Sequence, residues 1–159
     1  VGAIEEDAIE YLLHVTSSHP FYLQLLCRKL YEQAQERQVV LSKGCVEICV
    51  LAWLNKTDSS RFQHLWEANS NERMLHNKLI LSAIAQLSID QGDACYDYIS
   101  RLVCPLMPEH ILLGALEDLV ELGVLKQNRL SYAIEVELFA RWLRQHWPFE
   151  LLAKETHFK

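Results

Sequence analysis

The chain has 159 residues, of which 50% are hydrophobic and 23% are charged, and its formal net charge is −6. This length fits one medium domain or two small ones, and the hydrophobic content is sufficient for buried cores. The acidic balance excludes a general attraction to nucleic acid or anionic lipid, and no apolar run approaches the roughly 20 residues of a membrane span. No basic-then-apolar signal segment opens the chain, so we expect a cytoplasmic globular protein without a membrane partner.

The cysteines argue against both disulfides and a metal site. Five of them, an odd number, are spread through apolar stretches, unlike the framework of a secreted protein. Cys45 and Cys49 share a helix face, but no histidine or second cysteine pair accompanies them, so small core residues are expected there. The chain begins at Val1 without a methionine, and we interpret it as a piece of a longer protein.

Residues 1–68 predict a bundle of helices joined by short polar breaks. Apolar residues recur at three- and four-residue steps, which is typical of amphipathic helices. In chain order we expect a helix over 5–15, one from Pro20 to about Glu36, one capped by Ser42 that reaches Leu54, and a short one with Phe62, Leu65 and Trp66. The first half of the second helix is apolar nearly all round, which predicts burial on more than one side.

Residues 69–147 begin with two further helices. Asn69, with Glu72 three positions later, resembles a capping box and predicts a helix start. A turn over 90–93 precedes a single short helix around Tyr96 to Leu102, which the prolines that follow would close.

The stretch after Pro108 predicts a helix that runs directly into a β-hairpin. Pro108 suits a first helical turn, and Gly123 suits a left-handed stop. Over 130–134 apolar residues alternate with others, the period of a half-buried strand, which leaves Asn128 and Arg129 for the turn. A terminal helix with Trp142 follows and ends at Pro148, and 148–159 would be a tail.

The element order predicts a mostly α protein with a small helical bundle followed by a winged-helix domain with a short β-hairpin. The predicted domains are the bundle at 1–68, the winged helix at 69–147 and the tail at 148–159. Two stretches resemble the region that follows the nucleotide-binding core in STAND and related AAA+ ATPases. They are residues 18–27 (SHPFYLQLLC) with Tyr31 and Glu32, and residues 116–125 (LEDLVELGVL) with Tyr132 and residues 138–144 (LFARWLR).

In that family, including the NB-ARC-like and the archaeal and bacterial ATPase relatives, this region is a helical lid followed by a winged helix. The first stretch corresponds to a glycine-any-proline motif whose proline packs near the adenine of ATP or ADP. The resemblance therefore implies that Pro20 senses the nucleotide, with His19 beside it and Ser18 in the place of the glycine. The nucleotide itself would be bound by an upstream domain of the same chain, so no cofactor is expected in this part.

No catalytic or metal-binding pattern stands out, and the chain has neither a phosphate loop nor a strand ending in paired acidic residues. This part is therefore not expected to be an enzyme. The resemblance implies a regulatory module that senses the nucleotide state of the upstream domain and relays it through protein–protein contacts, as a part of a signal-transduction ATPase.

Two alternatives come from other features of the sequence. A DNA-binding module would use Lys126 and Arg129 of the hairpin, together with Arg141 and Arg144 of the terminal helix. The helix before the hairpin has no Lys or Arg, which argues against its entering the major groove. An oligomerisation domain would use exposed aromatic side chains, for which Trp53, Trp66 and Trp147 are the candidates.

Overall fold

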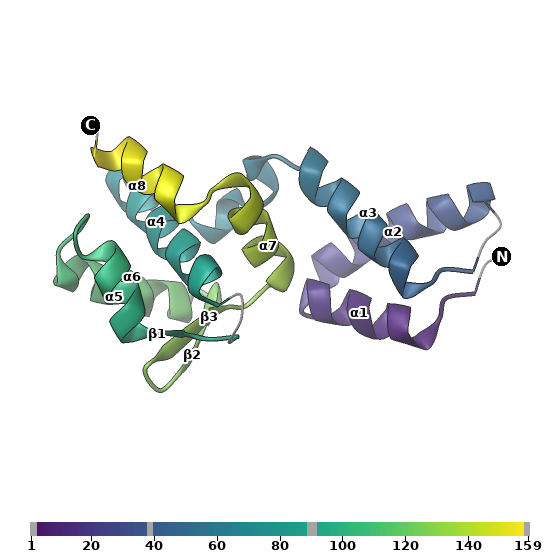
Figure 1. Cartoon of the computed structure of the whole chain (residues 1–159), viewed down its shortest axis with the longest axis horizontal. Helices are drawn as coiled ribbons and strands as arrows, with labels where there is room; N and C mark the ends of the chain where they lie inside the picture. Colours follow the sequence, from purple (N-terminus) through teal and green to yellow (C-terminus); the bar gives the residue numbers. More distant parts are fainter. Residues whose placement is uncertain (1–2, 38–39, 89–91, 158–159) are drawn as a thin grey trace. The chain divides into compact units, whose positions relative to one another are not determined.

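The computed structural model describes residues 3–37, 40–88 and 92–157 (Figure 1). Within them the chain is mostly helical and contains one small antiparallel sheet, so the predicted fold class, a helical bundle with a short hairpin, is confirmed. The chain divides into two compact units. Unit 1 comprises Val1–Asp58 with Val136–Leu138, and unit 2 comprises Ser59–Glu135 with Phe139–Lys159.

Unit 1 consists of three helices, α1 (Glu6–Thr16), α2 (Pro20–Arg37) and α3 (Lys43–Lys56). As predicted, Ser42 caps α3, and its Oγ accepts a hydrogen bond from the backbone N–H of Cys45 at 3.3 Å. A parallel bridge between Ile4 and Leu41 joins the segments that lead into α1 and α3.

Helix α2 buries one stripe of side chains. Tyr22, Leu26, Leu30 and Ala34 lie at four-residue steps and are at most 6% exposed. Phe21, by contrast, is 48% exposed. The rest of the chain therefore does not bury this helix on several sides, and the apolar residues outside the stripe remain at the surface.

Unit 2 combines helices with a three-stranded sheet. In chain order its elements are α4 (Asn71–Leu87), β1 (Ala94–Cys95), α5 (Tyr96–Val103), α6 (Glu109–Glu121), β2 (Leu125–Asn128), β3 (Ser131–Ile134), α7 (Glu137–His146) and α8 (Phe149–His157). The first two residues of α7 are counted with unit 1. The strands are antiparallel in the order β1-β3-β2, so β3 is central and the predicted hairpin forms one side of the sheet (Figure 1).

The hairpin begins after the predicted stop at Gly123, which has a φ of +77°. Its turn differs slightly from the prediction. Asn128 pairs with Ser131 in the strand register, so the loop consists of Arg129 and Leu130. Arg129 takes the left-handed conformation that a tight turn requires, with a φ of 57°.

The predicted short helix with Phe62 and Trp66 is wrong, and this changes the boundary between the units. The segment forms 3₁₀ turns at Ser59–Arg61 and Gln63–Leu65 and belongs to unit 2. Its aromatic side chains pack against α7: the Phe62 ring lies 5.1 Å from Phe139 and 5.5 Å from Trp142. Burial of these large rings fixes the segment there, so unit 1 ends at Asp58 and not at residue 68.

Two other differences concern element starts. Ser70, not Asn69, caps α4, because its Oγ accepts the backbone N–H of Arg73 at 3.2 Å. The predicted tail at 148–159 contains helix α8, whose first residue, Phe149, is 6% exposed. Pro148 both ends α7 and accepts the backbone N–H of Leu152 at the start of α8.

Candidate functional site

The start of α2 carries the residues that the resemblance singled out. Ser17 and Ser18 link α1 to α2 and have φ angles of 51° and 55°, in the left-handed region that favours glycine. The link is held by backbone hydrogen bonds, since Ser18 donates to Leu13 at 2.9 Å. His19 and Pro20 follow as exposed residues. The position predicted to replace a glycine thus has the backbone conformation of one.

An aromatic group anchors this exposed turn. The ring of Tyr22 is buried, and its centroid lies 5.0 Å from that of His19 and 5.1 Å from that of Phe21. Burial raises the pKa of the Tyr22 phenol to about 12. The exposed groups of His19, Pro20 and Phe21 are mainly ring surfaces. Such a surface suits packing against a planar or apolar group better than it suits binding phosphate.

The predicted cations of the hairpin are at the surface. Lys126 on β2 and Arg129 in the loop are both exposed. The side chain of Gln127 braces the loop, because its Nε2 donates to the backbone oxygen of Arg129 at 3.0 Å and to the hydroxyl of Tyr132 at 3.2 Å. Lys126 and Arg129 are therefore presented on an ordered hairpin.

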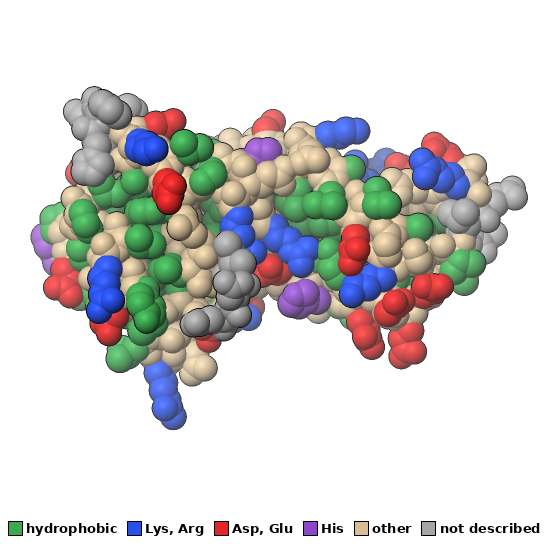
Figure 2. Space-filling model, in the orientation of Figure 1, with side chains coloured by type: hydrophobic (Ala, Val, Ile, Leu, Met, Phe, Trp, Pro, Cys, Tyr) green, Lys and Arg blue, Asp and Glu red, His purple; other side chains and the backbone are tan. Residues whose placement is uncertain are grey.

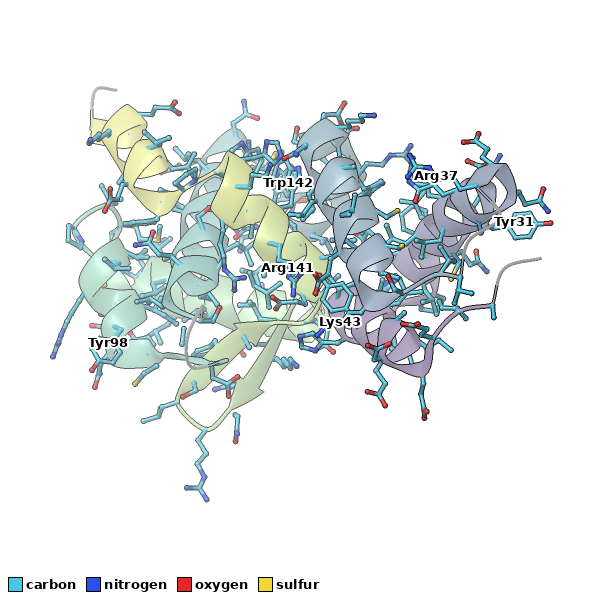
Figure 3. The ribbon with its side chains drawn as sticks, turned by 45° about the vertical axis from the view of Figure 1, so that its right-hand side comes forward. Tyr31, Arg37, Lys43, Tyr98, Arg141 and Trp142 are labelled. Carbon is cyan, nitrogen blue, oxygen red and sulfur yellow. The ribbon has the colours of Figure 1, made fainter. Side chains whose placement is uncertain are left out.

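The predicted cations of α7 are placed differently. Arg144 is half-buried, and its Nε donates to the backbone oxygen of Ala85 at 2.6 Å, while its Nη2 lies 3.4 Å from Ser88 Oγ. It therefore caps the last turn of α4, where a cation is favoured by the helix dipole. Arg141 lies on α7 beside the buried Trp142 and is also half-buried (Figure 3). These two arginines are therefore less exposed than Lys126 and Arg129 of the hairpin.

Acidic side chains mark several exposed surfaces instead. Figure 2 shows them gathered over α1, where Glu5, Glu6, Asp7 and Glu10 are all exposed. In unit 2, α6 carries four exposed acidic side chains, Glu109, Glu117, Asp118 and Glu121, and the helix has no Lys or Arg.

A groove runs between α4 and α6 in unit 2. One cavity of about 310 Å³ lies near the end of α6, and another of about 220 Å³ lies near its start, with Arg73 and Asn77 lining both. Arg73 spans the groove, and its Nη2 lies 2.6 Å from Asp118 Oδ2. The exposed fractions of these two side chains are 55% and 52%. Sequence reasoning missed this groove, because residues far apart in the chain form it.

The tryptophans proposed for oligomerisation are mostly internal. Trp53 is 6% exposed and Trp66 is 3% exposed, so neither can line a surface as predicted. Trp147 is half-buried, and the Nζ of Lys78 lies over its ring at 4.7 Å and over that of Trp66 at 5.6 Å. Trp66 and Trp147 therefore pack within unit 2, whereas Trp53 is buried on α3 of unit 1.

The described residues were also compared with the patterns of metal sites and of membrane-spanning helices. Within 3–37, 40–88 and 92–157, no three His, Cys, Asp or Glu side chains gather as metal ligands would. In the same part of the chain, none of the helices combines the length and the hydrophobicity that spanning a bilayer requires. Comparison with known proteins gives no significant match to a family model, a curated protein or a solved structure.

Proposed function

We propose that this chain is a non-catalytic regulatory and interaction module of a cytoplasmic STAND-type ATPase. In this proposal unit 1 is the helical lid and unit 2 is a winged helix. An upstream domain of the same protein would bind ATP or ADP, and this module would relay the nucleotide state through protein–protein contacts. The mechanism would be a two-state rearrangement, biased by contacts that differ between the ATP and ADP states.

The architecture of unit 2 supports the winged-helix assignment. A helix, a short strand, two helices and a hairpin follow one another from α4 to β3, and the central strand pairs with both β1 and β2. This is the element order of a winged helix, in which α6 would take the place of the recognition helix and the β2–β3 hairpin that of the wing.

The single observation that favours a protein partner over DNA is the charge of α6. A helix in the major groove approaches phosphates and reads bases mostly with Arg, Lys, Asn or Gln. Helix α6 has none of these residue types between Glu109 and Glu121 and carries four exposed carboxylates, of which, in the part of the chain that the structure describes, only Asp118 pairs with a cation, Arg73 of α4. Phosphates would be repelled by these carboxylates.

The proposed nucleotide contact rests on the turn before α2. Ser18 has the left-handed backbone of a glycine, and Pro20 is exposed at the first position of the helix. In the family that the chain resembles, a proline at this place packs near the adenine. An exposed proline ring would allow such packing by an upstream domain, with His19 at its edge.

The role of Pro20 can be tested in a protein that carries a nucleotide-binding domain ahead of this chain. Replacing Pro20 with Ala removes two methylene groups from the contact, so ADP affinity is expected to fall about fivefold. Isothermal titration with ADP measures this. The matched control is Pro105→Ala, which changes an exposed proline of unit 2. Equal ADP affinity in the Pro20 variant and the control would contradict nucleotide sensing by Pro20.

A second candidate, DNA binding by the hairpin, is favoured by the exposure of Lys126 and Arg129. Titrating a labelled mixed-sequence duplex at low salt tests it, because backbone binding is strongest there. We expect no binding at micromolar protein. Micromolar binding that is lost on Lys126→Glu with Arg129→Glu would replace the protein-contact proposal with DNA binding.

A further inference from the structure

The exposed surface of α6 combines charge with exposed apolar side chains. Leu113 on the helix is 48% exposed, and Leu122, the residue that follows the helix, is 70% exposed. Gly114 lies on the same helix, between Glu109 and Glu117 in the sequence. No atom lies within 4 Å of the position that a Cβ at Gly114 would take, so the surface at this residue is open. The exposed surface of this helix is therefore partly acidic and partly apolar.

The groove beside the end of α6 has the same mixed character. Its lining includes the carboxylates of Glu67, Asp118 and Glu121 and the side chain of Leu122. Arg73 is the single cationic side chain among the lining residues. Three carboxylates therefore face one guanidinium in a cavity of about 310 Å³.

The guanidinium of Arg73 is already engaged. It lies 2.6 Å from Asp118, so the other two carboxylates of the groove are those of Glu67, whose Oε1 accepts a hydrogen bond from the neutral Gln63 Nε2 at 3.2 Å, and Glu121. Among the residues that the structure describes, neither of them forms an ion pair with a Lys or Arg. An incoming cation could satisfy both of them without breaking the Arg73–Asp118 pair.

We infer that the α4–α6 groove docks a basic amphipathic helical segment of a partner protein, with an arginine between Glu67 and Glu121 and an apolar side chain on Leu122. A guanidinium presents several N–H donors in a plane, which suits the carboxylates that line one cavity. A groove between two helices, with an apolar contact beside it, suits a helix as the occupant. This inference rests on the proposed function, since it specifies the partner of the protein contact.

Charge decides between this occupant and the others. A nucleic acid would bring phosphates to the carboxylates, and a second copy of this chain would bring a net charge of −6. A basic segment is instead attracted by the carboxylates as it approaches the groove. Once bound, it also gains an apolar contact with Leu122. The acidic surface therefore provides both the attraction and the selectivity.

The test uses a fluorescein-labelled peptide of Arg, Leu and Ala, with Arg and Leu on one helical face, and measures anisotropy on titration with the whole chain. The control peptide has Glu in place of each Arg. The wild-type chain is expected to bind the basic peptide and not the control. In Glu67→Lys with Glu121→Lys, affinity is expected to fall by about tenfold or more. The control variant is Asp93→Lys, an exposed acid outside the groove, for which a change of about twofold or less is expected.

A third variant separates docking from a general attraction of opposite charges. Leu122→Gln leaves the net charge unchanged and replaces a side chain that is 70% exposed, so the fold is retained. Affinity is expected to fall about fivefold from the loss of the apolar contact. Unchanged affinity in this variant, or equal losses in the groove variant and Asp93→Lys, would overturn the inference. So would an absence of binding by the wild-type chain.

These outcomes are distinct from failure of the proposed function. If the basic peptide does not bind and the duplex does not bind either, the inferred groove is wrong but a protein contact elsewhere remains. If the duplex binds through Lys126 and Arg129, the proposed function itself fails. The ADP measurement on Pro20→Ala is independent of both results.

Discussion

At the scale of single residues, Tyr22 connects the candidate nucleotide contact to the core of unit 1. Its ring is 1% exposed and touches the rings of both His19 and Phe21. The exposed turn at the start of α2 is therefore positioned by a buried tyrosine. Burial that disfavours the charged phenolate also makes the stability of the unit sensitive to alkaline pH.

The expected effect is a loss of stability above pH 10. The folded-state pKa of Tyr22, about 12, is above the ordinary value of 10.0. Its protonated form therefore stabilises the folded state fully below pH 10, and this contribution is lost as the pH rises toward 12. The unfolding free energy of the wild type should therefore fall between pH 10 and pH 12. In Tyr22→Phe, which has no phenol at this position, the fall should be smaller by about 2 kcal/mol.

Urea denaturation followed by circular dichroism at several alkaline pH values measures this difference. Tyr31→Phe is the matched control, because Tyr31 lies on the same helix and is 58% exposed. A decrease in Tyr22→Phe as large as in the wild type would contradict the assignment of alkaline sensitivity to Tyr22.

At the scale of elements, the start of α4 gives a direct comparison of two capping residues. The sequence pattern of Asn69 and Glu72 predicts one cap, whereas the structure places the cap at Ser70, which accepts the N–H of Arg73. Ser70→Ala should lower the unfolding free energy by about 1 kcal/mol, because a backbone donor loses its partner. Asn69→Ala should change it by less than about 0.5 kcal/mol. Urea denaturation checks both, and a larger loss for Asn69→Ala would support the sequence-based cap.

Elements that depend on local signals were predicted from the sequence. Ser42 at the start of α3 and Gly123 after α6 act through the backbone of their own few residues, and both were confirmed. Strand β1 was missed because it has two residues, too few for an alternating pattern, and forms only by pairing with β3. Helix α8 was missed because Pro148 was interpreted only as a stop, whereas proline can also start a helix.

The candidate site was predictable to a lesser extent. The sequence singled out His19, Pro20, Lys126 and Arg129, and the structure places all four at the surface. That Ser18 adopts a left-handed backbone is not evident from a serine in the sequence. The α4–α6 groove depends on packing between residues separated by more than forty positions, as the Arg73–Asp118 pair shows. No local pattern reports such a contact.

At the scale of the whole molecule, the boundary between the units follows aromatic packing and not the position of polar breaks. Residues 59–68 look like the end of the first bundle in sequence, but Phe62 and Trp66 are buried with the aromatic residues of α7. The chain also returns to unit 1 at Val136–Leu138. There the backbone N–H of Glu137 donates to Ser17 Oγ at 3.0 Å. Contacts between segments this far apart cannot be read from periodicity.

Two units with separate cores should respond separately to core deletions. Leu26 in unit 1 and Leu112 in unit 2 are both 0% exposed, and replacing either with Ala should cost about 2–5 kcal/mol. Native-state hydrogen exchange on the whole chain should show lowered protection mainly in α1 to α3 for Leu26→Ala, and mainly in α4 to α6 for Leu112→Ala. The amide of Glu137 should respond to Leu26→Ala, because its acceptor Ser17 belongs to unit 1. Equal losses of protection in both units for each variant would show that the chain unfolds as a single cooperative body, and the proposed separation into a lid and a relay would lose its physical basis.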